Sequence, residues 1–83
     1  MPRPRGAIDR ALEGNEHFDD VKKTHGVYGR ALGAMHVIAE ESELLGDMVA
    51  AADLRSTSSA LDCRGAARIR ALARIRRQGR TKA

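Results

Sequence analysis

Apolar side chains recur through the middle of the chain at alternating steps of four and three residues, interrupted only at Ser42. A broad apolar stripe with this period is typical of a helix that packs through one face. The pattern predicts a helix over residues 27–55, and the stripe itself is the predicted assembly interface. Its members are Ala31, Met35, Ile38, Leu45, Val49 and Ala52.

The pair Gly46-Asp47 is the weak point of this predicted helix. Glycine costs about 1 kcal/mol relative to alanine inside a helix, and aspartate is a preferred N-cap residue. A second helix that began at Asp47 would turn the rod into a hairpin. We expect the helix to continue, straight or kinked at Gly46, and keep the hairpin as the alternative.

Shorter elements are predicted before the long helix. Residues 1–6 contain two prolines and two arginines, which favour an extended basic arm. Residues 7–25 are predicted to form two short helices, 7–13 and 16–24, separated by the turn signal at Gly14.

A second predicted helix follows a polar run of Ser and Thr and covers residues 60–77. Ser59 and Asp62 resemble an N-terminal capping pair at its start. Gly79 is expected to end the helix, which leaves 78–83 as a loose basic tail.

The expected fold class is all-α, because no alternation of useful length predicts a strand. We expect a small helical bundle or hairpin, built on one long amphipathic helix and a C-terminal basic helix, in a single domain over residues 1–83. A chain of 83 residues buries only about 60–65% of its unfolded surface, and this one has no Trp. We therefore expect a homo-oligomer, or a larger protein partner, to complete the apolar surface.

Charge is distributed unevenly along the sequence. The last twenty residues hold eight of the fifteen Lys and Arg and none of the eleven Asp and Glu. The formal net charge of +4 is thus the sum of a segment at +8 and a body at −4. Such an asymmetry points to a polyanionic partner or to self-association between the two halves.

The last predicted helix separates an apolar side from a basic side at about 100° per residue. Large apolar residues share one sector: Leu61, Ile69, Leu72 and Ile75. Arg70, Arg74 and Arg77 cluster on the opposite side. Arg68 and Arg76 fall inside the apolar sector, where they would snorkel or meet carboxylates such as those of the glutamate run 40–43.

Arginine presents a planar fork that matches phosphate oxygens, and each neutralised phosphate releases counterions. We therefore expect binding to nucleic acid, most simply duplex DNA, through backbone contacts, since Asn15 and Gln78 are the sole Asn and Gln that could read bases. The alternatives are an acidic protein surface or pairing with the chain's own carboxylates; a membrane surface is not expected. The predicted nucleic-acid-binding residues are Arg3, Arg5, Arg64, Arg70, Arg74, Arg77, Arg80 and Lys82.

No motif in the chain predicts catalysis, and we expect no enzyme, no metal and no cofactor. The three histidines lack the paired spacing of metal ligands, and Cys63 is expected to be a packed thiol. Gly29 and Gly33 are expected to let another helix approach closely. The lone cysteine and the lack of a signal-like or membrane-spanning apolar run predict a cytoplasmic protein, in the host cytoplasm if it is viral.

One Ala-rich stretch resembles the C-terminal part of small terminase subunits from phages of actinobacteria. It reads Leu45-Gly-Asp-Met-Val-Ala-Ala-Ala-Asp-Leu54-Arg55-Ser-Thr57-Ser-Ser-Ala-Leu61 and covers about a fifth of the chain. The resemblance implies a small helical oligomer that recognises DNA and hands it to a large ATPase subunit. It also implies structural roles for Leu54, Arg55 and Thr57, with DNA contacts on the basic segments. The Arg-dense C-terminal helix departs from the family pattern.

The sequence thus supports two hypotheses of different classes. The first is a non-enzymatic, oligomeric helical nucleic-acid-binding protein, for which the resemblance implies a role in phage DNA packaging. The second is a small helical adaptor, inhibitor or structural assembly subunit that binds a protein partner. Steep weakening of binding with salt would mark the first, and a stoichiometric protein complex that survives high salt would mark the second.

Overall fold

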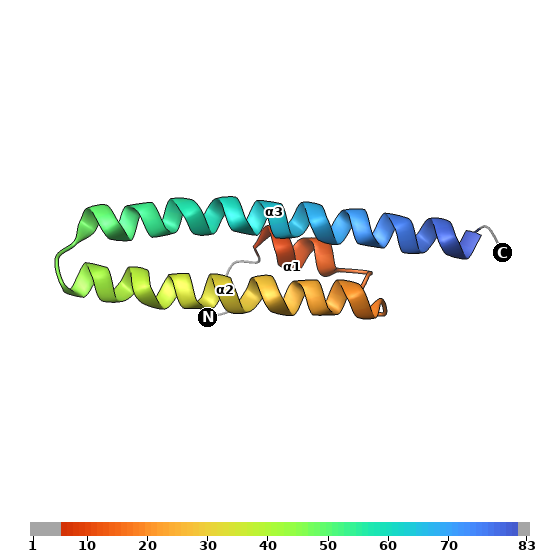
Figure 1. Ribbon diagram of the computed structural model, residues 1–83, viewed down its shortest axis with the longest axis horizontal. Helices are drawn as coiled ribbons and strands as arrows, with labels where there is room; N and C mark the ends of the chain where they lie inside the picture. Colours follow the sequence, from red (N-terminus) through yellow and green to blue (C-terminus); the bar gives the residue numbers. More distant parts are fainter. Residues whose placement is uncertain (1–5, 82–83) are drawn as a thin grey trace.

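The computed structural model describes residues 6–81, which form three helices and no strand (Figure 1). Helix α1 spans Ala7–Leu12, α2 spans Asp19–Leu44 and α3 spans Met48–Thr81. The expected all-α fold class is confirmed.

Helices α2 and α3 lie side by side and antiparallel, joined by a tight turn (Figure 1). Helix α1 packs against both of them, away from that turn. Helix α3 is the longer of the two, and its carboxyl end extends past the start of α2 (Figure 1). The result is an elongated hairpin, 57 Å along its longest axis.

The turn corrects the continuous helix that was expected over residues 27–55, and the alternative hairpin is the structure that forms. Gly46 has a φ of 82°, in the left-handed region that favours glycine. The amide of Asp47 donates to the carbonyl of Ser42 at 2.8 Å, which closes the helix end in a Schellman motif. The Asp47 side chain then accepts a hydrogen bond from the amide of Ala50 at 3.0 Å and caps α3.

Other predicted boundaries were also wrong. No separate helix covers 16–24, because α2 begins at Asp19 and continues through Gly26. The predicted helix 60–77 is part of α3, which contains the Ser and Thr run as well as Gly79. A propensity deficit of about 1 kcal/mol at one glycine is smaller than the stabilisation that core burial gives the same helices.

The hydrophobic core lies where α1 meets the hairpin. Val21 and Ile69 are its largest fully buried side chains. The ring of Tyr28 from α2 packs directly against Gly65 of α3, since a Cβ there would lie 2.8 Å from Cδ1 of Tyr28. The buried core residues are Ile8, Ala11, Phe18, Val21, Ala66, Ile69 and Ala73.

Gly29 and Gly33 do not play the role expected of them. No described atom would lie within 4 Å of a Cβ at either position. The tight contact lies at Gly65 instead, where the side chains of Tyr28 and Ile8 leave no room for a Cβ, and the sequence pattern did not single this glycine out.

Asp62 joins the middle of α3 to the start of α1. Its Oδ2 accepts a hydrogen bond from the amide of Ala7 at 2.8 Å, and its Oδ1 accepts one from Ile8 at 3.0 Å. The N-cap residue of α1 is Gly6, which has no side chain to make these bonds. The predicted capping pair of Asp62 with Ser59 was therefore wrong: Asp62 satisfies the free amides of another helix.

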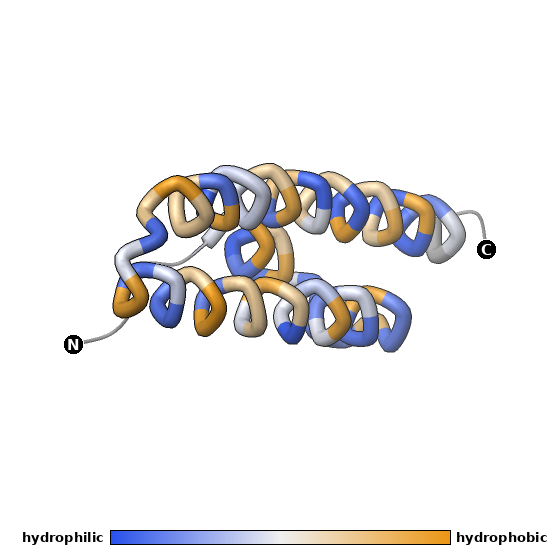
Figure 2. The backbone as a smooth tube through the Cα atoms, turned by 60° about the vertical axis from the view of Figure 1, so that its left-hand side comes forward, coloured by the Kyte–Doolittle hydropathy of each residue, from blue (hydrophilic) through white to orange (hydrophobic). Residues whose placement is uncertain are grey.

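The half of the hairpin near the turn has a much thinner core. Ala39 and Ala51 are buried there, but Leu44 and Leu45 are 88% and 86% exposed and Val49 is 74% exposed. Figure 2 shows the apolar residues of both helices at this end. Small alanine side chains supply the burial between the helices here, so the large apolar side chains remain at the surface, as at many interaction sites.

Candidate nucleic-acid interface

Four arginines of α3 project into solvent and form the basic ridge, defined as Arg64, Arg68, Arg70 and Arg74. None of them makes an ion pair with a carboxylate among residues 6–81. Their guanidinium groups are therefore available to an external anion.

The next two arginines, Arg76 and Arg77, form hydrogen bonds with residues at and just before the start of α2. Nε of Arg76 donates to Oδ2 of Asp20 at 2.9 Å. Nη2 of Arg77 donates to Oδ1 of the buried Asn15, whose own amide donates to the carbonyl of Ala11 at 2.9 Å. Asp20 offsets the charge of Arg76, whereas the neutral amide of Asn15 anchors Arg77 and leaves its positive charge in place.

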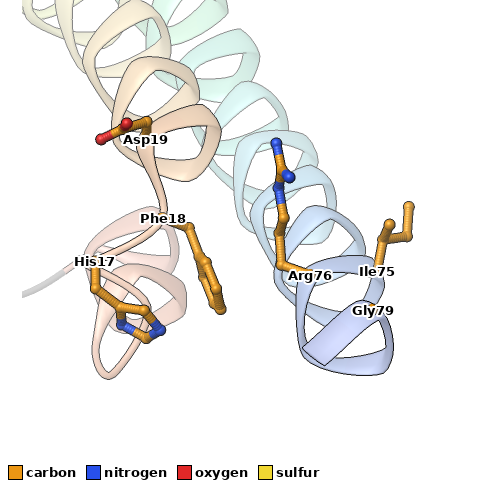
Figure 3. Close-up of a pocket in the computed structure, with 6 residues that line it drawn as sticks. All are labelled: His17, Phe18, Asp19, Ile75, Arg76 and Gly79. Carbon is orange, nitrogen blue, oxygen red and sulfur yellow. The ribbon is translucent and has the colours of Figure 1, made fainter. Parts of the chain in front are cut away.

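The surroundings of Arg76 show how the end of α3 meets the body. Figure 3 shows Arg76 reaching toward the first turn of α2 while Ile75 points away from it. Phe18 lies between these elements, and it lines a surface pocket together with Ile75 and Arg76. Arg76 therefore faces the body rather than an external ligand.

The glutamate run 40–43 does not pair with Arg68 or Arg76, which had been one expectation. These glutamates lie near the turn, at the other end of the hairpin, where Glu43 pairs with Arg55. Arg68 is exposed. It lies about 100° around α3 from the buried Ile69, at the edge of the face that packs against the other helices.

The basic ridge consists of two rows on α3. At about 100° per residue, measured from the buried Ile69, Arg64 and Arg68 fall on one edge and Arg70 and Arg74 on the other. With a rise of about 1.5 Å per residue, the ridge extends over about 15 Å of helix. Such a surface suits contacts with successive phosphates, since each guanidinium can bind phosphate oxygens bidentately.

The remaining predicted binding residues fall at or beyond the ends of the described chain. Arg3, Arg5 and Lys82 lie outside the described residues. The backbone of Arg80 is helical, and its side chain is outside the description. The tail expected to be loose from residue 78 is thus helical as far as Thr81.

The turn divides the predicted assembly interface between two helices. Ala31 and Met35 are half-buried on α2, and Ile38 on the same helix is 49% exposed. Leu45 lies in the turn, and Val49 and Ala52 are exposed on α3. These residues would form one stripe only on a continuous helix, so the structure keeps the α2 part together and separates the rest.

The other polar groups form local pairs. Nε2 of His25 lies 2.9 Å from Oδ1 of Asp9, and Nε2 of His36 lies 2.9 Å from Oε1 of Glu40. Within the described part of the chain, no three potential ligands gather in a metal-binding group. Cys63 is exposed, contrary to the packed thiol that was expected.

Comparisons with protein-family models, with curated proteins and with solved structures gave no match to this chain. Over the described residues, no helix combines the length and apolar character needed to cross a membrane. The molecule is thus characterised by its own geometry: an all-α hairpin with an exposed basic ridge on its longer helix.

Proposed function

We propose that this protein is a non-enzymatic nucleic-acid-binding protein that holds duplex DNA by its phosphates. The observation that carries the proposal is the basic ridge, whose four arginines have no carboxylate partner among the described residues although the chain contains eleven Asp and Glu. A solvated helix face normally mixes charges of both signs. Unpaired guanidinium groups in two rows favour an external polyanion.

Duplex DNA fits the spacing of the ridge. It carries one negative charge per about 1.7 Å of helix axis, so an approximately 15 Å ridge meets several phosphates on either strand. Base reading is not part of the proposal, because Asn15 is buried and engaged with Arg77 and Ala11. Binding should therefore be nearly independent of DNA sequence.

The test removes two ridge charges, by Arg70→Gln with Arg74→Gln, and measures duplex affinity at several salt concentrations. If each arginine neutralises one phosphate, the slope of log K against log salt should become shallower by about 1.8, at about 0.9 per contact. Two duplexes of unrelated sequence should give the same slope. Fluorescence anisotropy supplies the affinities, and circular dichroism checks that helicity is retained.

The matched control removes two charges elsewhere, by Lys23→Gln with Arg30→Gln. Both side chains are exposed on α2, and neither has a partner among the described residues. The control should change the slope far less than the ridge variant. Equal effects of the two variants, or full affinity in the ridge variant, would contradict the proposal.

A phage DNA-packaging role is a narrower form of the same proposal. It rests on the resemblance of the segment 45–61 to small terminase subunits, and it adds a large ATPase subunit as partner and the host cytoplasm as location. The exposed Leu44, Leu45 and Val49 at the turn offer a surface for such a partner. A complex with the ATPase subunit that forms without DNA and is lost in Leu44→Asp would support this role.

The same apolar turn favours the second candidate function, a helical adaptor or assembly subunit that binds a protein. Leu44 and Leu45 are the most exposed large apolar residues described, and burying them in a partner would be favourable at about 25 cal/mol per Å². A stoichiometric protein complex that survives high salt, with no retention of DNA, would favour this function over the first.

A further inference from the structure

The surface between the two rows of the basic ridge consists of small side chains. Measured from the buried Ile69 at about 100° per residue, Ala60, Ala67 and Ala71 lie within about 20° of the direction that points away from the core. All three are exposed, and together we call them the alanine strip. The two rows of the basic ridge lie about 40–80° to either side of this strip. The exposed side of α3 therefore has a shallow centre and two long cationic margins.

Helices α1 and α2 both lie on the opposite side of α3. Figure 1 and Figure 2 show them together on one side of α3 in both views. The buried residues of α3 in this region, Ala66, Ile69 and Ala73, fall within about 60° of one another. Among residues 6–81, no element covers the alanine strip. This side of α3 can therefore enter a groove ahead of the rest of the molecule.

The major groove of B-form DNA has the dimensions that this side of α3 requires. The groove is about 12 Å wide and about 8.5 Å deep, and it admits an α-helix, whose diameter with side chains is about 10–12 Å. Methyl groups at the centre of the exposed side let the backbone of α3 come close to the base edges. The longer arginine side chains on either side then reach the two phosphate backbones that border the groove, where each guanidinium can bind phosphate oxygens bidentately.

Other nucleic-acid surfaces fit this side of α3 less well. The minor groove of B-form DNA is about 6 Å wide, which is too narrow for a helix. The major groove of an RNA duplex is deep and narrow, and side chains do not reach its floor. A single strand has one backbone for two rows of arginines, and proteins bind it by stacking bases on aromatic side chains. Helix α3 contains no aromatic residue.

We propose that the exposed side of α3 lies in the major groove of B-form duplex DNA. The alanine strip faces the base edges, and each row of the basic ridge binds one of the two phosphate backbones. This inference rests on the proposed function, and it adds the form of nucleic acid and the groove. Alanine side chains cannot form hydrogen bonds with base edges, so this mode of docking agrees with binding that is nearly independent of sequence.

A bulky neutral side chain in the alanine strip tests the docking without changing any charge. Ala67→Trp should weaken binding to duplex DNA at least about 10-fold at low salt, because the indole holds both rows of arginines away from their phosphates. The same variant should not weaken binding to a single strand, where an indole adds a stacking surface. The matched control is Ala34→Trp, at an exposed position of α2, which should leave duplex affinity unchanged. Fluorescence anisotropy measures affinity, and circular dichroism checks helicity.

Chemical protection of the DNA identifies the groove. Dimethyl sulfate methylates guanine N7, which lies in the major groove, and adenine N3, which lies in the minor groove. Saturating protein should protect guanine N7 on both strands of a short duplex and leave adenine N3 reactive. In a competition assay at equal salt, an RNA duplex of the same sequence should displace the DNA at least about 10-fold less effectively, because its major groove does not admit the helix.

The outcomes separate this proposal from the one on which it rests. A salt dependence that becomes shallower in Arg70→Gln with Arg74→Gln supports the proposed function by itself. The major-groove proposal alone would be overturned if Ala67→Trp then bound duplex DNA as tightly as Ala34→Trp. Protection of adenine N3 in place of guanine N7, or equal competition by the RNA duplex, would overturn it as well. No binding of DNA by the unmodified protein would overturn both proposals.

Discussion

Gly65 and Asp62 lie one turn apart on α3 and govern how the other helices meet it. Asp62 accepts hydrogen bonds from the first two amides of α1. Gly65 leaves room for the ring of Tyr28 from α2 and for the side chain of Ile8 from α1. One turn of α3 thus positions both neighbours, by a charge-assisted cap on one side and by the absence of a Cβ on the other.

Gly65→Ala is expected to destabilise the protein by up to about 2 kcal/mol. The added methyl group would lie 2.8 Å from the Tyr28 ring and 3.1 Å from Cδ1 of Ile8. Overpacking of this kind costs about 1–3 kcal/mol, which outweighs a gain of about 1 kcal/mol in helix propensity. Gly33→Ala is the control, where no described atom comes within 4 Å and up to about 1 kcal/mol should be gained. Urea unfolding measures both, and a gain in both variants would show that Gly65 is not a packing contact.

At the scale of elements, the turn between α2 and α3 decides whether the molecule is a rod or a hairpin. Its conformation depends on three linked features: the left-handed Gly46, the Schellman hydrogen bonds that end α2, and the Asp47 cap of α3. Each is local, and each lies within a few residues of the others. The apolar stripe extends across both helices and does not reveal this break, because its period continues through the turn.

Gly46→Ala distinguishes the turn from a helix interior by the sign of its effect. A non-glycine residue in the left-handed region costs about 1–2 kcal/mol, so the variant should lower the free energy of unfolding by about that amount. Gly26→Ala is the control, since Gly26 lies within α2 and an added methyl group would meet no described atom within 4 Å. The control should gain up to about 1 kcal/mol. Unfolding curves compare the two; a stabilising Gly46→Ala would mean that the helix runs straight through.

At the scale of the whole molecule, stability is concentrated at one end. Large buried side chains such as Val21, Phe18 and Ile69 lie where α1 packs, while burial near the turn comes from Ala39 and Ala51. Folding stability of a domain this size is about 0.05–0.15 kcal/mol per residue. A single large core residue therefore accounts for a substantial part of the total.

Ile69→Ala should lower the free energy of unfolding by about 2–5 kcal/mol, because it empties a fully buried site where three helices meet. Leu44→Ala removes a comparable side chain that is 88% exposed, and it should change stability by less than about 0.5 kcal/mol. Thermal and urea unfolding at equal protein concentration compare the variants. A loss in Leu44→Ala that approached the loss in Ile69→Ala would place a second core at the turn.

The sequence pattern succeeded where the evidence is local. It predicted the all-α class, and it offered the hairpin at Asp47 as the alternative to a continuous helix. It also placed Arg70 and Arg74 on the side of α3 away from the apolar sector, where the structure has them exposed. It failed at the ends of helices: Gly79 was expected to end the last helix because of its low helix propensity, but α3 continues through it to Thr81.

Contacts between distant residues were missed because no periodicity encodes them. Asp62 caps a helix 54 and 55 positions away along the chain. Arg76 pairs with Asp20 and Arg77 with Asn15 across similar separations. A clue existed for Asp62, since α1 has no capping side chain of its own, but which residue accepts the hydrogen bonds of its first amides depends on how the helices cross.

Helicity and the segregation of cations into α3 are properties of the amino-acid order, since they arise from spacing within one helix and from composition. Only the tertiary structure decided where the rod folds back, which arginines meet a carboxylate and which side of α3 stays uncovered. The physical reason is that propensity and periodicity act over a few residues, whereas pairing and burial depend on the positions of whole helices relative to one another.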